Sequence, residues 1–122
     1  MSSSRKIFII EDDPDVLRIY TDTLTEKGYA IASISNSSEA LSLLKQHLPH
    51  LILLDIMIPG NANGIELLGQ IKRDPNLKKI PIIVLTNLDT EEKIARELGA
   101  DEYMVKPNVT RDQVVSAIQK YI

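Results

Sequence analysis

Cysteine is absent from the 122-residue sequence, so the chain can form neither a disulfide nor a thiolate metal site. This absence is typical of cytosolic proteins, and we expect a cytoplasmic location. No block of lysine and arginine stands out and the formal net charge is −3, which argues against nucleic acid as a direct partner. Apolar runs such as residues 51–54 are far too short to cross a membrane, so we expect no membrane partner.

The remaining composition is that of an ordinary globular domain. Hydrophobic residues make up 43% of the chain and charged residues 25%. A chain of this length suits one domain, which can bury roughly two-thirds of the surface of its unfolded state. Residues 1–4 lack the apolar core of a signal peptide, and we expect them to be a disordered leader before a single domain over residues 5–122.

Strand-like and helix-like segments alternate along the whole chain. The short, mostly apolar segments predicted as buried strands are residues 6–10, 29–34, 51–54, 80–85 and 102–105. A helical pattern follows each of them, and capping sequences predict helix starts at Asp13, at residues 36–39, at residues 89–92 and at Thr110 with Gln113. This alternation predicts an α/β fold in three layers, with helices on both faces of a parallel sheet.

Polar side chains follow four of the predicted strands at their carboxyl ends, where open α/β sheets bind ligands. They are Glu11 and Asp12, then Asp55, Thr86 and Lys106. Neighbouring carboxylates repel one another by about 4 kcal/mol at ~4 Å near a protein surface, and a divalent cation would offset that repulsion. A carboxylate nucleophile, a hydroxyl and a lysine suit a phosphoryl group. The set therefore predicts a site for Mg²⁺, with Mn²⁺ as a substitute, and a phosphoryl group.

Four segments together resemble the receiver (REC) domain of the two-component response regulator family. They are FIIEDDP, LILLDIMIPG, VLTN and GADEYMVKP, in the family's order and over essentially the full chain. The resemblance implies a flavodoxin-like (βα)5 fold with a five-stranded parallel sheet in the order 2-1-3-4-5.

The resemblance also implies a role for each polar residue of the predicted metal site. Asp55 would be the phosphoacceptor and a metal ligand, and Asp12 would bind the metal directly. Glu11 would hold the ion through water, and the backbone carbonyl of Met57 would complete the protein ligands.

Further implied roles concern the phosphoryl group and the switch. Thr86 and Lys106 would contact the phosphoryl group, and the Lys106–Pro107 peptide would be cis. Tyr103 matches the family's switch aromatic, which turns inward when Thr86 moves toward the phosphate, although a half-buried edge aromatic is an alternative. Asp13 is better explained as a helix cap than as a support of the metal.

The implied function is a phosphorylation-activated switch rather than an enzyme with a separate substrate. It would take its phosphoryl group from a histidine kinase or a histidine phosphotransfer protein, catalysing only its own phosphorylation and dephosphorylation. It would signal to an unknown protein target through the surface of the fourth helix, fifth strand and fifth helix. A monomer, a phosphorylation-dependent dimer, a stand-alone regulator and a piece of a longer protein remain alternatives. Past Lys106–Pro107 one helix is expected, and no output domain.

Three other functions are disfavoured by the same residues. A flavin carrier of this architecture would find its FMN phosphate repelled by residues 11–13. A dehalogenase-like phosphatase would carry its nucleophile after the first strand, whereas Asp55 follows the third. A pseudo-receiver without phosphorylation conflicts with the intact set of acceptor residues.

The chain departs from the family pattern at two places near the predicted site. The loop from Asp55 to Gly64 is one residue longer than usual, with residues 61–63 in place of a typical Met-Asp pair. Asn87 stands where the family mostly has alanine or glycine. We hypothesise that Asn87 alters the lifetime of the aspartyl phosphate; equal dephosphorylation rates in the parent and Asn87→Ala would contradict this.

Overall fold

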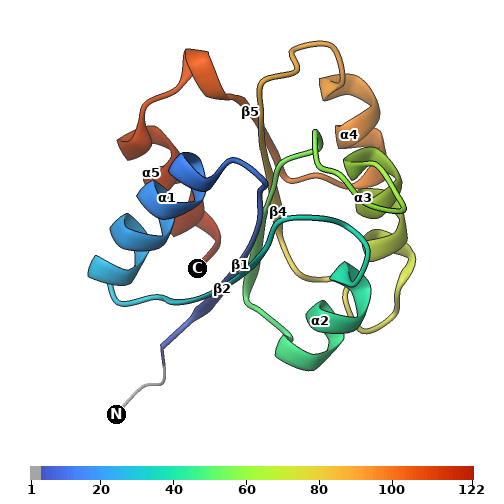
Figure 1. The fold of residues 1–122 in the computed structure, drawn as a ribbon, viewed down its shortest axis with the longest axis horizontal. Coiled ribbons are helices and arrows are strands. Elements are labelled where there is room, and N and C mark those ends of the chain that lie inside the picture. Colours follow the sequence, from blue (N-terminus) through green and yellow to red (C-terminus); the bar gives the residue numbers. More distant parts are fainter. Residues whose placement is uncertain (1–3) are drawn as a thin grey trace.

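Strands and helices alternate along residues 4–122, the part of the chain that the computed structural model describes (Figure 1). The elements are β1 (Lys6–Ile10), α1 (Pro14–Glu26), β2 (Ala30–Ile34), α2 (Ala40–His47), β3 (Leu51–Leu54), α3 (Gly64–Arg73), β4 (Ile82–Thr86), α4 (Glu92–Leu98), β5 (Glu102–Val105), a 3-10 turn (Lys106–Asn108) and α5 (Arg111–Tyr121). Except for Ser4, the expected leader of residues 1–4 lies outside the described residues. No helix of the described part is long and apolar enough to cross a bilayer.

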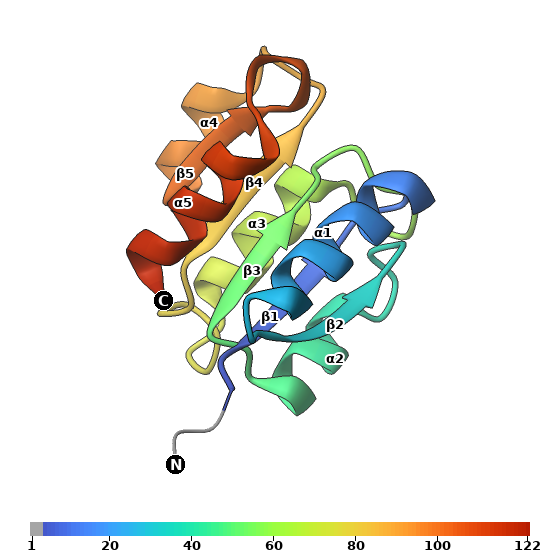
Figure 2. The same cartoon turned by 90° about the vertical axis from the view of Figure 1, so that its left-hand side faces the viewer.

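The five strands form one parallel sheet in the order β2-β1-β3-β4-β5. Helices α1 and α5 cover one face, and α2, α3 and α4 cover the other, as Figure 1 shows. Figure 2 looks onto the first of these faces, with α1 and α5 in front of the strands. The predicted three-layer α/β fold and its strand order are therefore confirmed.

The core is divided by the sheet into two apolar layers. In β1, Ile7 and Ile9 face the α1 and α5 layer, while Phe8 and Ile10 face the other helices. All four side chains are 0–2% exposed. Successive side chains of a strand point to opposite faces, so a strand covered on both sides needs an unbroken apolar run.

Two of the predicted helix starts are confirmed. Asp13 caps α1, since its carboxylate accepts hydrogen bonds from the backbone N–H groups of Asp15 and Val16. Thr110 and Gln113 form a capping box at α5, with N–H to side-chain distances of 2.8 and 3.1 Å.

The other two starts are displaced. The helix predicted from residues 36–39 begins only at Ala40, because Asn36 uses its side chain to accept from the Ser38 N–H in a local turn. Similarly, α4 begins at Glu92 and Glu91 provides no side-chain cap. The strands predicted from residues 29 and 80 begin at Ala30 and Ile82 instead. Pro81 has no N–H for the ladder, which shortens the second of these.

Candidate functional site

The pairing of β1 with β3 brings two of the predicted carboxylates together. Ile10 pairs with Leu54, and the Asp55 N–H donates to the Ile10 carbonyl at 2.9 Å. Glu11 and Asp55 therefore leave adjacent strands at the same edge of the sheet. Both are buried, at 3% and 4% exposure. Together with the exposed Asp12 they can bring three carboxylate oxygens within 4.8 Å of one another.

Lys106 reaches this pair of carboxylates from the end of β5. Its Nζ lies 2.8 Å from Glu11 Oε1 and 2.9 Å from Asp55 Oδ2. Burial is the largest effect on Glu11 and raises its pKa, although the hydrogen bond from Lys106 acts in the opposite sense. Burial also disfavours the charged lysine, but its bonds to the two carboxylates prevail and raise the pKa of Lys106. The two carboxylates thus keep the Lys106 ammonium protonated.

The charge of the cluster fits a hard divalent cation. Three carboxylates and one ammonium give a formal net charge of −2. Carboxylate oxygens are the ligands that Mg²⁺ and related hard cations prefer. Asp55 is already oriented, because its Oδ1 accepts the Met57 N–H at 2.9 Å while Oδ2 faces Lys106. The acidic cluster therefore supports divalent metal binding at this edge of the sheet.

Thr86 and Tyr103 both form hydrogen bonds with the backbone of Leu88. Thr86 is fully buried at the end of β4, and its hydroxyl accepts the Leu88 N–H at 3.4 Å. Tyr103 is 8% exposed, and its hydroxyl donates to the Leu88 carbonyl at 2.6 Å. Tyr103 is therefore buried rather than half-buried, although it lies on the edge strand β5, and burial raises its pKa. Asn87, which lies between Thr86 and Leu88 in the sequence, has an exposed side chain.

The expectation of a cis Lys106–Pro107 peptide is wrong for this structure. Residues 4–122 contain no cis peptide bond. Lys106 instead opens a 3-10 turn with Pro107 in its first positions. The trans form of an X–Pro bond is favoured by roughly 0.5–1 kcal/mol, and the fixed φ of proline suits the first turn of a helix. Lys106 reaches both carboxylates in this conformation.

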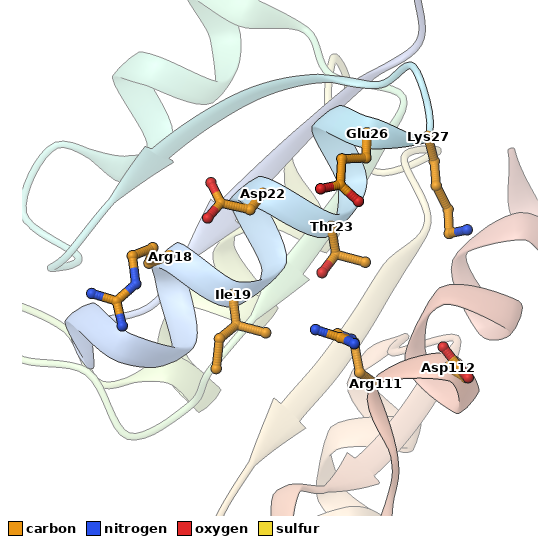
Figure 3. Close-up of a pocket in the computed structure, with 8 residues that line it drawn as sticks. All are labelled: Arg18, Ile19, Asp22, Thr23, Glu26, Lys27, Arg111 and Asp112. Atoms are coloured by element: carbon orange, nitrogen blue, oxygen red, sulfur yellow. The ribbon is translucent and has the colours of Figure 1, made fainter.

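A separate groove lies between α1 and α5 (Figure 3). Its volume is about 400 Å³, and no predicted site residue lines it. The lining comprises Arg18, Ile19, Asp22, Thr23, Glu26, Lys27, Arg111 and Asp112. Three bases balance three acids there, so the groove lacks the excess of one charge that distinguishes the cluster at the strand ends.

A comparison of the sequence with models of known protein families agrees with the fold and with the acidic cluster. The family model of the response regulator receiver domain matches residues 7–119. The chain belongs to this family. Receiver domains are the phosphoacceptor signalling domains of two-component systems, and the described architecture is theirs.

Two curated relatives carry a receiver-like region of matching sequence. The chain is 38% identical over 103 residues to the transcriptional regulatory protein AfsQ1 of Streptomyces coelicolor, covering 83% of the chain and 44% of that protein. It is 36% identical over 109 residues to the probable transcriptional regulator ycf27 of Guillardia theta, covering 88% and 41%. The chain therefore spans less than half the length of these relatives.

Solved receiver structures superpose closely. The BeF3-activated N-terminal receiver domain of RstA from Klebsiella pneumoniae matches with a TM-score of 0.87 and 26% identity, over 96% of this chain and 97% of that one. The Mn(2+)-bound form of the response regulator Rcp1 matches with a TM-score of 0.81 and 28% identity, over 96% and 93%.

Proposed function

We propose that Asp55 is the phosphoacceptor of this receiver domain, which spans residues 5–122. The observation that best supports this proposal is the position of the Asp55 carboxylate. It is 4% exposed at the end of β3 and bonded to the Lys106 ammonium on one oxygen and the Met57 N–H on the other. The donor would be a phosphohistidine of a histidine kinase or phosphotransfer protein, met in the cytoplasm.

Glu11, Asp12 and Asp55 would hold a Mg²⁺ ion together with the Met57 backbone carbonyl. The bound dication would supply positive charge that offsets the repulsion between these carboxylates and an incoming phosphoryl group. The net charge of −2 in the cluster supports this assignment. Mn²⁺ has the same preference for oxygen ligands, and the relative Rcp1 is described as Mn(2+)-bound.

In the transfer, a carboxylate oxygen of Asp55 attacks phosphorus. A P–O bond forms as the P–N bond to the histidine breaks, and the leaving imidazole nitrogen takes up a proton. Lys106 would exchange its Asp55 contact for a phosphoryl oxygen, and the Thr86 hydroxyl would donate to another. Hydrolysis of the acyl phosphate returns the carboxylate, and the domain would catalyse only its own phosphorylation and dephosphorylation.

Leu88 provides a route from the phosphoryl group to the surface. When the Thr86 hydroxyl turns to the phosphoryl group, it gives up the Leu88 N–H, while Tyr103 still holds the Leu88 carbonyl. Phosphorylation would thereby shift an equilibrium between two positions of the β4–α4 connection. The surface of α4, β5 and α5 would present this change to a downstream protein target, with the domain as a monomer or a phosphorylation-dependent dimer.

Mass spectrometry after incubation with acetyl phosphate and Mg²⁺ tests the proposal. One phosphoryl adduct is expected in the parent and in the control Asp22→Asn, which changes an exposed aspartate on α1. Asp55→Asn and chelation by EDTA should each abolish the adduct. An adduct that survives in Asp55→Asn would place the acceptor elsewhere, and a parent that stays unmodified in every metal would indicate a pseudo-receiver.

A further inference from the structure

The longer loop between β3 and α3 is tied to the β2–α2 turn by one serine. The Ser37 hydroxyl donates to the Ala62 carbonyl and accepts the Ala62 N–H at 3.0 Å. The Ser37 N–H donates to the Pro59 carbonyl at 2.9 Å. Three hydrogen bonds from a single residue thus hold both sides of the loop tip.

Burial and close packing show that this contact is built into the fold. Ser37 is only 5% exposed, although it lies in a turn. Gly60 lies directly against it, with φ at +131°. A methyl group added to Gly60 would come within 2.6 Å of the Ser37 backbone nitrogen and closer still to its hydroxyl. Only a glycine allows the loop to approach the serine in this way.

The other end of the loop is fixed beside Asp55. The Gly64 N–H donates to the Ile56 carbonyl at 3.1 Å, and a methyl group on Gly64 would collide with the Ile56 backbone. The Met57 N–H is held by Asp55. Met57 therefore lies in a short segment that is anchored at its base by Asp55 and Ile56 and at its tip by Ser37.

We propose that Ser37 is a positioning residue for the metal site. By fixing the loop tip it limits the positions open to the Met57 carbonyl, which is a metal ligand under the function proposed above. Ligand sets held in advance bind metal more tightly, and partners outside the ligand set commonly change affinity about 10–100-fold. Ser37 contacts only backbone atoms of the loop, so we expect an effect at or below the lower end of that range.

Titration with Mn²⁺, with free ion followed by electron paramagnetic resonance, tests the role of the hydroxyl. Ser37→Ala should raise the Mn²⁺ Kd about three- to tenfold. The control Ser38→Ala changes an exposed neighbour and should keep the parent Kd. Ile118→Val, a mild change in the α5 core, should lower the melting temperature and also keep the parent Kd. An unchanged Kd in folded Ser37→Ala would overturn the proposal.

A measurement on the parent alone provides an independent test. Coupling between two sites is reciprocal, so Mn²⁺ should slow hydrogen exchange of the Ser37 and Ala62 amides if Ser37 supports the metal site. Unaltered exchange at these amides, in protein saturated with Mn²⁺, would overturn the proposal. A parent that binds no Mn²⁺ at all would instead defeat the proposed metal site, so the two failures are distinguishable.

Discussion

At the amino ends of the strands, charged and polar side chains are bonded to backbone groups, whereas at the carboxyl ends two buried carboxylates depend on one shared ammonium. Asp101 accepts the Ile82 N–H at 2.9 Å, and His50 accepts the Lys6 N–H at 2.9 Å. Lys72 donates to two carbonyls and lies 3.6 Å from Asp101.

The carboxyl edge keeps an excess of negative charge that its own residues do not balance. Glu11 and Asp55 share Lys106, and Asp12 adds a third carboxylate nearby. The amino edge is therefore arranged for stability, whereas the carboxyl edge retains a capacity for additional positive charge.

The largest effect should come from Lys106→Met at the carboxyl edge. Two buried carboxylates would lose their shared counter-ion, and removal of one partner of a buried pair lowers the free energy of unfolding by about 3–5 kcal/mol. Urea denaturation at neutral pH measures the loss. Saturating Mg²⁺ should recover part of it, because the ion would replace the missing positive charge. A variant as stable as the parent would contradict the described dependence on Lys106.

A smaller effect is expected from Lys72→Met at the amino edge. The variant loses hydrogen bonds to the carbonyls of Lys78 and Ile80, at 3.3 and 3.0 Å. We expect a loss of about 1–2 kcal/mol in urea denaturation, since typical hydrogen bonds contribute about 1 kcal/mol each. The control Lys79→Met removes an exposed lysine and should be nearly neutral. If Lys72→Met also lost phosphorylation, the amino edge would be needed for function as well as for stability, which would contradict the difference between the two edges.

The smallest effect concerns the exposed pair of Tyr121 and Glu102 at the start of β5. The Tyr121 hydroxyl donates to Glu102 at 2.8 Å, which raises the pKa of Tyr121 to about 12 and lowers that of Glu102. The tyrosine's contribution to stability is present below its ordinary value of 10 and is lost as pH rises through about 12. In Glu102→Gln, ultraviolet titration should show Tyr121 ionising nearer 10, with under ~1 kcal/mol change in stability. An unchanged tyrosine titration would refute the pairing.

The fold was predictable because its signals are repeated along the chain. The three inner strands β1, β3 and β4 bury apolar side chains on both faces, as burial by two helix layers requires, and the strand ends identify the acidic cluster without any knowledge of contacts. Asp13 and Thr110 were predictable as caps because their partners lie within three residues.

Features decided by distant contacts were not predictable. Ser37 and Ser38 are adjacent and chemically identical, yet only Ser37 is buried, because a loop 25 residues away folds onto it. The helix start predicted at residues 36–39 was wrong for a local reason, since an Asn side chain can hydrogen-bond within a turn or cap a helix equally well. The cis Lys106–Pro107 bond was expected from the family resemblance alone, and residues 4–122 contain no cis peptide bond.

The parallel register of β1 and β3 has a consequence for the energetics of the whole domain. Glu11 and Asp55 are brought together by the Ile10 to Asp55 hydrogen bond, and no comparable cluster exists in an unfolded chain. Any cation that needs Asp55 beside Glu11 and Asp12 therefore binds the native state preferentially. Its concentration then contributes to folding stability, by about 2.7 kcal/mol when the free ion is at about 100 times its Kd. Divalent cations in the cell would thus stabilise the folded domain even before it is phosphorylated.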